Sequence, residues 1–156
     1  MFALLALGRF GWSPQGWGLL PLLIALALVI VLDLRSRIIP DVITLPAIVY
    51  ALLLALVLGG TAGLAEGGLG MAAAGGGVWL LAIASRGGIG GGDIKLMAVL
   101  GAALGWKGAL IAFALSQIAA GIVALVLIIA RRRPGEALPV GAFIAFFGGL
   151  ILIARP

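Results

Sequence analysis

The sequence contains neither cysteine nor histidine, and these two absences exclude several kinds of chemistry. Without cysteine the chain has no disulfide and no thiolate nucleophile, and without either residue it has no Cys/His zinc site. The absence of histidine also excludes the Ser–His and Cys–His pairs on which many hydrolases depend. An H-E-x-x-H zinc protease is excluded for the same reason.

Charged residues are scarce as well. Of the 156 residues, 10% are charged and 64% are hydrophobic, whereas a soluble domain is about a quarter charged and about half apolar. So few charges could not cover a soluble surface, and such high hydrophobicity excludes a disordered chain. The composition therefore predicts a polytopic membrane protein that has the lipid bilayer as its surroundings.

Apolar runs alternate along the chain with short breaks rich in glycine and basic residues. Because a transmembrane helix needs about 20 mainly apolar residues, the runs predict an all-α bundle of about six transmembrane helices. The predicted helices cover residues 19–34, 42–58, 69–84, 94–104, 109–130 and 137–154. Residues 1–16 resemble no cleavable signal peptide, and we expect an interfacial segment there, outside the first helix.

The basic residues indicate how the predicted helices are oriented. Seven of the ten lysines and arginines fall in the breaks after the first, third and fifth helices or just inside the fourth, and three fall on the opposite side. Since basic residues favour the cytoplasmic side, both termini are predicted to lie outside. Membrane anchoring also explains the net charge of +5, and no nucleic-acid partner is expected.

Small residues recur four positions apart in the third and fourth predicted helices. Such pairs allow helix backbones to approach closely in lipid, so we expect them at helix contacts. The pairs are Gly63/Gly67, Ala72/Gly76, Ala73/Gly77 and Gly101/Gly105.

Only five acidic residues are present, and Asp33 stands out among them. It lies within the first apolar run, where an ionisable group costs about 2.5–3.5 kcal/mol, and such groups usually face the bundle interior and serve a function. The alternative is an ion pair with Arg35 or Arg37 at the membrane edge. Glu66 and Glu136 are expected to be solvated residues of loops.

Two further aspartates fall on the same predicted side as Asp33. Asp93 ends a glycine-rich stretch, residues 87–92, in which glycine permits positive φ and close backbone approach. It is either a functional acid or the N-cap of the fourth helix; a phosphate-binding loop is disfavoured because no G-K-[ST] follows. Asp41 follows Pro40 and is mainly expected to cap the second helix, with a direct catalytic role as the alternative.

A pair of aspartates remains as the candidate for the catalytic groups of an intramembrane active site. When paired carboxyl groups share one proton, the ionised group can act as a base on water while the protonated group polarises a carbonyl. Such a pair requires no metal and no cofactor.

Two motifs resemble those of type IV prepilin peptidases. Residues 33–41 resemble their D-x-R-x-x-x-I-P-D stretch, and residues 90–95 resemble their G-x-G-D-x-K motif, which is also found in presenilin and archaeal preflagellin peptidases. The two motifs together, with two predicted helices between them, are more specific than either alone.

The resemblance implies an aspartic endopeptidase of the inner membrane that removes the leader of type IV prepilins and pseudopilins. It places the catalytic aspartates at Asp33 and Asp93, and motif residues at Gly90, Gly92 and Lys95. Asp41 matches a further motif acid.

Many bacterial members of this family also carry an N-terminal methyltransferase domain with paired C-x-x-C motifs. Because this chain has no cysteine, it resembles the short, peptidase-only subtype that serves tad/Flp pili. We therefore expect residues 1–156 to form one membrane-embedded peptidase domain. A small transporter or channel subunit and an inert assembly subunit are the alternatives, and the sequence does not indicate the oligomeric state.

Overall fold

The computed structural model describes residues 8, 14–86, 88–130 and 138–154, and in these ranges every regular element is an α-helix. The helices are α2 (Pro14–Ser36), α3 (Asp41–Ala84), α4 (Gly91–Ile129) and α5 (Val140–Ala154). The first three are long and apolar enough to cross a membrane. The predicted all-helical membrane architecture is therefore consistent with the structure. Residues 1–7 and 9–13, most of the predicted interfacial segment, lie outside the described residues, as does Glu136. Residues 14–16 belong to α2 and not, as predicted, to a segment outside the first helix.

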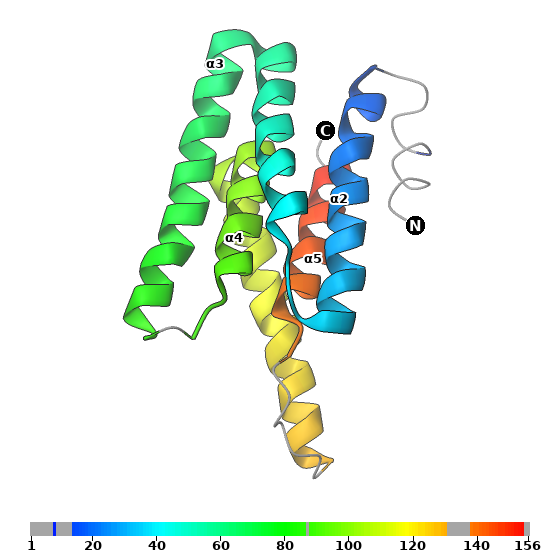
Figure 1. The fold of residues 1–156 in the computed structure, drawn as a ribbon, viewed down its shortest axis with the longest axis vertical. Coiled ribbons are helices and arrows are strands. Elements are labelled where there is room, and N and C mark those ends of the chain that lie inside the picture. Colours follow the sequence, from blue (N-terminus) through cyan, green and yellow to red (C-terminus); the bar gives the residue numbers. More distant parts are fainter. Residues whose placement is uncertain (1–7, 9–13, 87, 131–137, 155–156) are drawn as a thin grey trace.

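The structure does not support six separate helices. The second and third predicted helices both belong to α3, and the fourth and fifth both belong to α4. Each element contains a single glycine with non-helical dihedral angles: Gly60 has φ 62° and ψ −153°, and Gly105 has φ 71° and ψ 170°. Residues other than glycine rarely adopt such positive φ values. The two glycines therefore permit α3 and α4 each to fold back as two arms (Figure 1).

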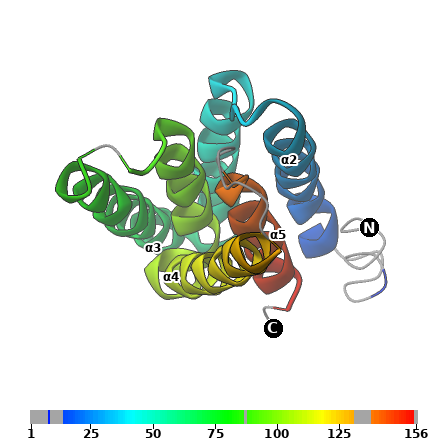
Figure 2. The same cartoon turned by 90° about the horizontal axis from the view of Figure 1, so that it is seen from below.

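The arms pack around a core that is built from one face of α2 and from the buried parts of α4 and α5. Leu22, Leu26 and Val29 recur at helical spacing and are each at most 2% exposed. They belong to the same cluster as Met97 and Ile144, which are fully buried. Seen from below, α5 lies in the middle of the bundle with α2 and α4 on its two sides (Figure 2).

Large apolar side chains cover the outer faces of the helices. Val42 is 83% exposed, Val57 is 78% exposed and Ile129 is 73% exposed. A soluble protein rarely presents an apolar surface of this extent, whereas lipid tails solvate it well. The exposed surface is therefore that of a protein that lies in a bilayer.

Candidate active site

Four helix ends meet at one end of the bundle, the lower end in Figure 1. They are the last turn of α2 and the first turns of α3, α4 and α5. The three aspartates of the two sequence motifs lie at these ends: Asp33 in the last turn of α2, Asp41 at the start of α3 and Asp93 in the first turn of α4. The antiparallel order of the arms thus brings together residues that are far apart in the sequence.

Asp33 is buried, with 5% of its surface exposed. Its carboxylate accepts a hydrogen bond from the backbone N–H of Ala142 in the first turn of α5, at 2.7 Å to Oδ2. Four residues after Asp33, Arg37 adopts a left-handed conformation with φ 54°, and its N–H donates to the Asp33 carbonyl at 3.0 Å. Left-handed residues commonly end helices, so α2 ends one turn after its buried acid.

Asp93 is half-buried and projects from the beginning of α4. The helix begins after Gly90, whose carbonyl accepts a hydrogen bond from the Asp93 N–H at 3.1 Å. The Asp93 side chain is therefore not the N-cap, because Gly90 occupies that position. The carboxyl group of Asp93 interacts with the backbone of Gly90 and with Asp33.

The carboxyl groups of Asp33 and Asp93 meet at Gly141 of α5. A Cβ atom placed on Gly141 would lie 3.0 Å from Oδ1 of Asp93 and 3.1 Å from Oδ2 of Asp33. Oxygens of both carboxyl groups therefore lie within 3.1 Å of one point in space. The structure thus brings the two residues of the predicted catalytic pair together.

The two carboxyl groups open into a cleft of about 510 Å³. The glycine-rich segment before α4 forms one wall, and the segment between α2 and α3 forms another. Gly92 is tightly packed, since a Cβ atom there would lie 2.8 Å from Cβ of Ile39, whereas Gly90 has more room. The cleft is lined by Asp33, Arg37, Ile38, Ile39, Gly88, Gly90, Gly91, Gly92, Asp93, Leu138, Val140 and Gly141.

Asp41 does not have the capping role that its position after Pro40 predicts. The N-cap of α3 is Pro40, and Asp41 is the first residue of the helix. Its carboxylate instead forms an ion pair with Lys95, at 2.6 Å between Oδ1 and Nζ. Because Lys95 follows Asp93 by two residues, this pair connects the start of α3 to the turn of α4 that carries Asp93.

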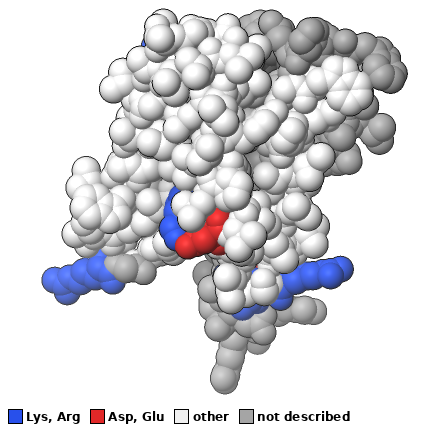
Figure 3. All heavy atoms as spheres, turned by 45° about the horizontal axis from the view of Figure 1, so that its top comes forward, with Lys and Arg blue, Asp and Glu red and all other residues white. Residues whose placement is uncertain are grey.

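The charged side chains show how this end differs from the rest of the surface. Most of the described lysines and arginines lie toward one end of a surface that otherwise carries few charges (Figure 3). Among the described residues, no group of three or more Asp, Glu, His or Cys side chains could hold a metal ion. The ionisable side chains that line the cleft are those of Asp33, Asp93 and Arg37.

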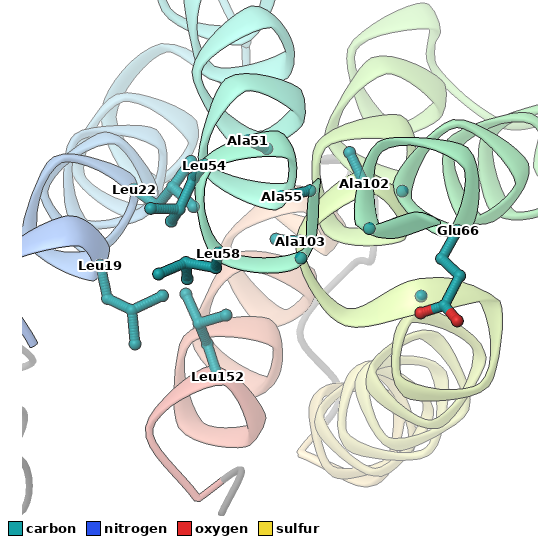
Figure 4. Close-up of a pocket in the computed structure, with 14 residues that line it drawn as sticks. Leu19, Leu22, Ala51, Leu54, Ala55, Leu58, Glu66, Ala102, Ala103 and Leu152 are labelled. Atoms are coloured by element: carbon teal, nitrogen blue, oxygen red, sulfur yellow. The ribbon is translucent and has the colours of Figure 1, made fainter. Parts of the chain in front are cut away.

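A second cleft, of about 330 Å³, lies near the bends of α3 and α4, toward the other end of the bundle. Its walls are leucines, small residues and Glu66 (Figure 4). Glu66 is exposed, as predicted, but it lies within α3 and not in a loop. This cleft has a single acidic side chain in its wall and therefore no carboxyl pair.

Sequence reasoning did not identify the contribution of α5 to the cleft. Gly141 and the Ala142 amide contact the acids, although they follow Asp33 by more than a hundred residues. The one local signal is a glycine two residues after Pro139, at the start of the last apolar run. Ile39, which packs against both Gly92 and Gly141, lies within the motif of residues 33–41.

The fold and the cleft define a helical membrane protein in which acidic side chains meet at one end of the bundle. Residues 20–125 match the type IV leader peptidase family, and the chain belongs to this family. No solved structure matches the chain significantly.

Three curated relatives are named prepilin leader peptidase/N-methyltransferase. The protein from Aeromonas hydrophila is 33% identical over 97% of this chain and 55% of its own length. The protein from Neisseria gonorrhoeae is 33% identical over 94% of this chain and 53% of its own length. The protein from Xanthomonas campestris pv. campestris is 29% identical over 92% and 52%. The chain thus spans about half the length of these relatives.

Proposed function

We propose that this chain is a prepilin leader peptidase that cleaves type IV prepilins or pseudopilins by aspartic catalysis. Asp33 and Asp93 are the catalytic residues of this proposal. The observation that carries it is the position of their carboxyl groups, with an oxygen of each within 3.1 Å of the same point beside Gly141. The family supports the leader peptidase activity, and the carboxyl pair supports the aspartic chemistry. The proposal concerns the peptidase activity alone.

The proposed reaction uses one ionised and one protonated carboxyl group. The ionised group removes a proton from a water molecule, and the water oxygen attacks the carbonyl carbon of the scissile peptide bond. The protonated group donates its proton to the carbonyl oxygen, which gives a neutral tetrahedral intermediate. The C–N bond then breaks: the leaving amine nitrogen receives a proton from the acid that had acted as the base, and the other carboxylate takes a proton from a hydroxyl of the intermediate as the C=O bond reforms.

The position of the cleft supports cleavage at the boundary of the membrane. Both acids lie at helix ends, and not halfway along the apolar helices. We propose that this boundary is the cytoplasmic face of the bacterial inner membrane and that the prepilin helix stays in lipid while its leader junction enters the cleft. Gly90 leaves room there for an extended substrate, whereas Gly92 packs closely against Ile39. Mature termini several residues inside the apolar segment, measured by mass spectrometry, would contradict this.

The proposed function is tested by co-expression of the chain with a tagged prepilin. Leader removal appears as a mobility shift of the prepilin. Asp33→Asn and Asp93→Asn keep the size of the side chain but cannot accept the proton from water, so each should lower cleavage by about 10³-fold or more. Membrane insertion, checked by fractionation, should be unchanged.

Glu66→Gln is the matched control, because it makes the same chemical change at an exposed acid near the other cleft. It should cleave at the wild-type rate. Full activity of either aspartate variant would refute the catalytic pair. A wild-type chain that never shifts the prepilin would instead favour the alternative of a small transporter or channel subunit.

A further inference from the structure

We propose that Gly141 is a positioning residue of the active site, and that its missing side chain sets the spacing of the two carboxyl groups. The inference rests on the proposed function and extends the site to a third region of the chain. Gly141 belongs to neither of the two motifs that carry the aspartates. It acts through Asp33 and Asp93, and the proposal gives it no direct part in the reaction.

The first turn of α5 reaches into the site from the middle of the bundle. Helix α5 packs against α2, which carries Asp33, and against α4, which carries Asp93 (Figure 2). The turn begins at Val140, whose N–H donates to the Leu138 carbonyl at 2.8 Å. Gly141 and Ala142 follow and are both buried. The backbone of α5 is thus the surface on which the acids of the other two helices converge.

The space beside Gly141 has no room for a methyl group. A Cβ atom there would collide with Cδ1 of Ile39 and would lie 3.0 Å and 3.1 Å from the two carboxyl groups. Cδ1 is the end of the flexible Ile39 side chain and can shift, but at 3.0 Å and 3.1 Å the two carboxyl oxygens would still be too close to a methyl group. A methyl group at position 141 must therefore displace the carboxyl groups, the α5 backbone or both.

The same turn also holds one of the acids in place. The Ala142 N–H donates to Oδ2 of Asp33 at 2.7 Å, so a shift of the α5 backbone would carry Asp33 with it. Catalysis by two groups depends on their relative geometry, and a displacement of about 1 Å can cost about 100-fold in rate. The addition of a single methyl group at Gly141 should therefore alter the spacing of the two carboxyl groups.

The test uses the full chain, purified in detergent, with a purified prepilin as the substrate. Gly141→Ala should lower kcat by about 100-fold or more. It should also change the shape of the pH–rate profile, because the way in which two carboxyl groups share a proton depends on their separation. A mere loss of folded protein would lower the rate at every pH and leave that shape unchanged.

Gly121→Ala is the matched control, since a Cβ atom on Gly121 in α4 would meet nothing within 4 Å. It should retain activity within about twofold, because it adds the same methyl group in open space. Thermal unfolding of each variant shows whether the measured protein is folded. Wild type and Asp33→Asn are assayed alongside: if wild type fails to cleave, the proposed function fails. If wild type cleaves and Gly141→Ala matches it, only the present inference fails.

A second comparison distinguishes the effect of contacts with the carboxyl groups from the effect of the contact with Ile39. Ile39→Val removes Cδ1, the atom that a methyl group at position 141 would meet first, and so gives Gly141→Ala a background with more room. The Ile39→Val/Gly141→Ala double variant should stay impaired by at least about tenfold relative to Ile39→Val, because the contacts with the carboxyl groups remain. Recovery to the Ile39→Val rate would overturn the proposal, since the effect would then be packing against Ile39 alone.

Discussion

At the scale of single residues, the ion pair between Asp41 and Lys95 connects the two motifs through residues that lie 54 positions apart in the sequence. Its side chains are 54% and 39% exposed, respectively. Pairs of this exposure contribute about 0.2–1 kcal/mol, so Asp41→Asn should lower prepilin cleavage by no more than about fivefold. That loss is far smaller than the loss expected from Asp33→Asn, and steady-state kinetics on both variants would show the difference.

A charge exchange separates positioning by this pair from direct catalysis by Asp41. The Asp41→Lys/Lys95→Asp double variant restores a pair of opposite charges in the reverse order. It should be more active than either single charge reversal. If Asp41→Asn alone is as inactive as Asp33→Asn, Asp41 takes part in the reaction itself.

The two catalytic candidates could be predicted from the sequence because each has a local signal. Asp33 interrupts an apolar run, and Asp93 follows five glycines within six residues. Gly141 has no such signal, since its importance comes from contacts with Asp33, Asp93 and Ile39 that only the tertiary structure creates. The Asp41–Lys95 pair was missed because Pro-Asp at a helix start favours a cap as a local interpretation.

At the scale of elements, glycines determine where two helices touch. Gly70 of α3 and Gly101 of α4 face each other so closely that a Cβ atom on either would collide with the carbonyl oxygen of the other. On Gly101 it would also lie 2.9 Å from Cβ of Ala74. This contact fixes the first arm of α4, which carries Asp93, against the second arm of α3.

Gly101→Ala should therefore destabilise the fold by about 1–3 kcal/mol, the usual cost of overpacking. Gly77→Ala is the control in α3, because a Cβ atom there meets nothing within 4 Å, and it should be neutral or slightly stabilising. Midpoints of thermal unfolding in detergent measure both changes. Equal midpoints for the two variants would contradict the contact between Gly70 and Gly101.

The small-residue pattern predicted that α3 packs closely but did not identify the face. Gly63, Gly67 and Gly101 lie at helix contacts, as predicted, whereas Ala72 and Ala73 are exposed and Gly76 has open space beside it. The second arm of α3 carries small residues on every side, so spacing alone leaves several faces possible. The bends at Gly60 and Gly105 were predicted as loops, because a glycine between apolar runs predicts a break but not whether the helix resumes at once.

At the scale of the whole molecule, the orientation in the membrane is still a prediction. Because the native chain has no cysteine, single cysteines report on accessibility without background. Ser36→Cys and Ser85→Cys, at the end with the acids, should resist an impermeant thiol reagent in intact cells and react after permeabilisation. Thr61→Cys, beside the bend of α3, should react in intact cells. The opposite pattern would reverse the orientation inferred from the basic residues.

Two of the helical segments that border the acids, α5 and the first arm of α4, are short. Helix α5 has 15 residues and spans about 22 Å, and residues 91–104 of α4 span about 21 Å, whereas residues 106–129 of α4 span about 36 Å. A typical hydrocarbon layer is about 30 Å thick. The protein should therefore thin the bilayer locally, so that headgroups and water descend to the carboxyl pair on one side of the molecule.

In reconstituted vesicles, cleavage should slow several-fold as the phosphatidylcholine acyl chains are lengthened, because a thicker layer costs more to deform. A rate that does not depend on acyl-chain length would show that water reaches the acids without any help from hydrophobic mismatch.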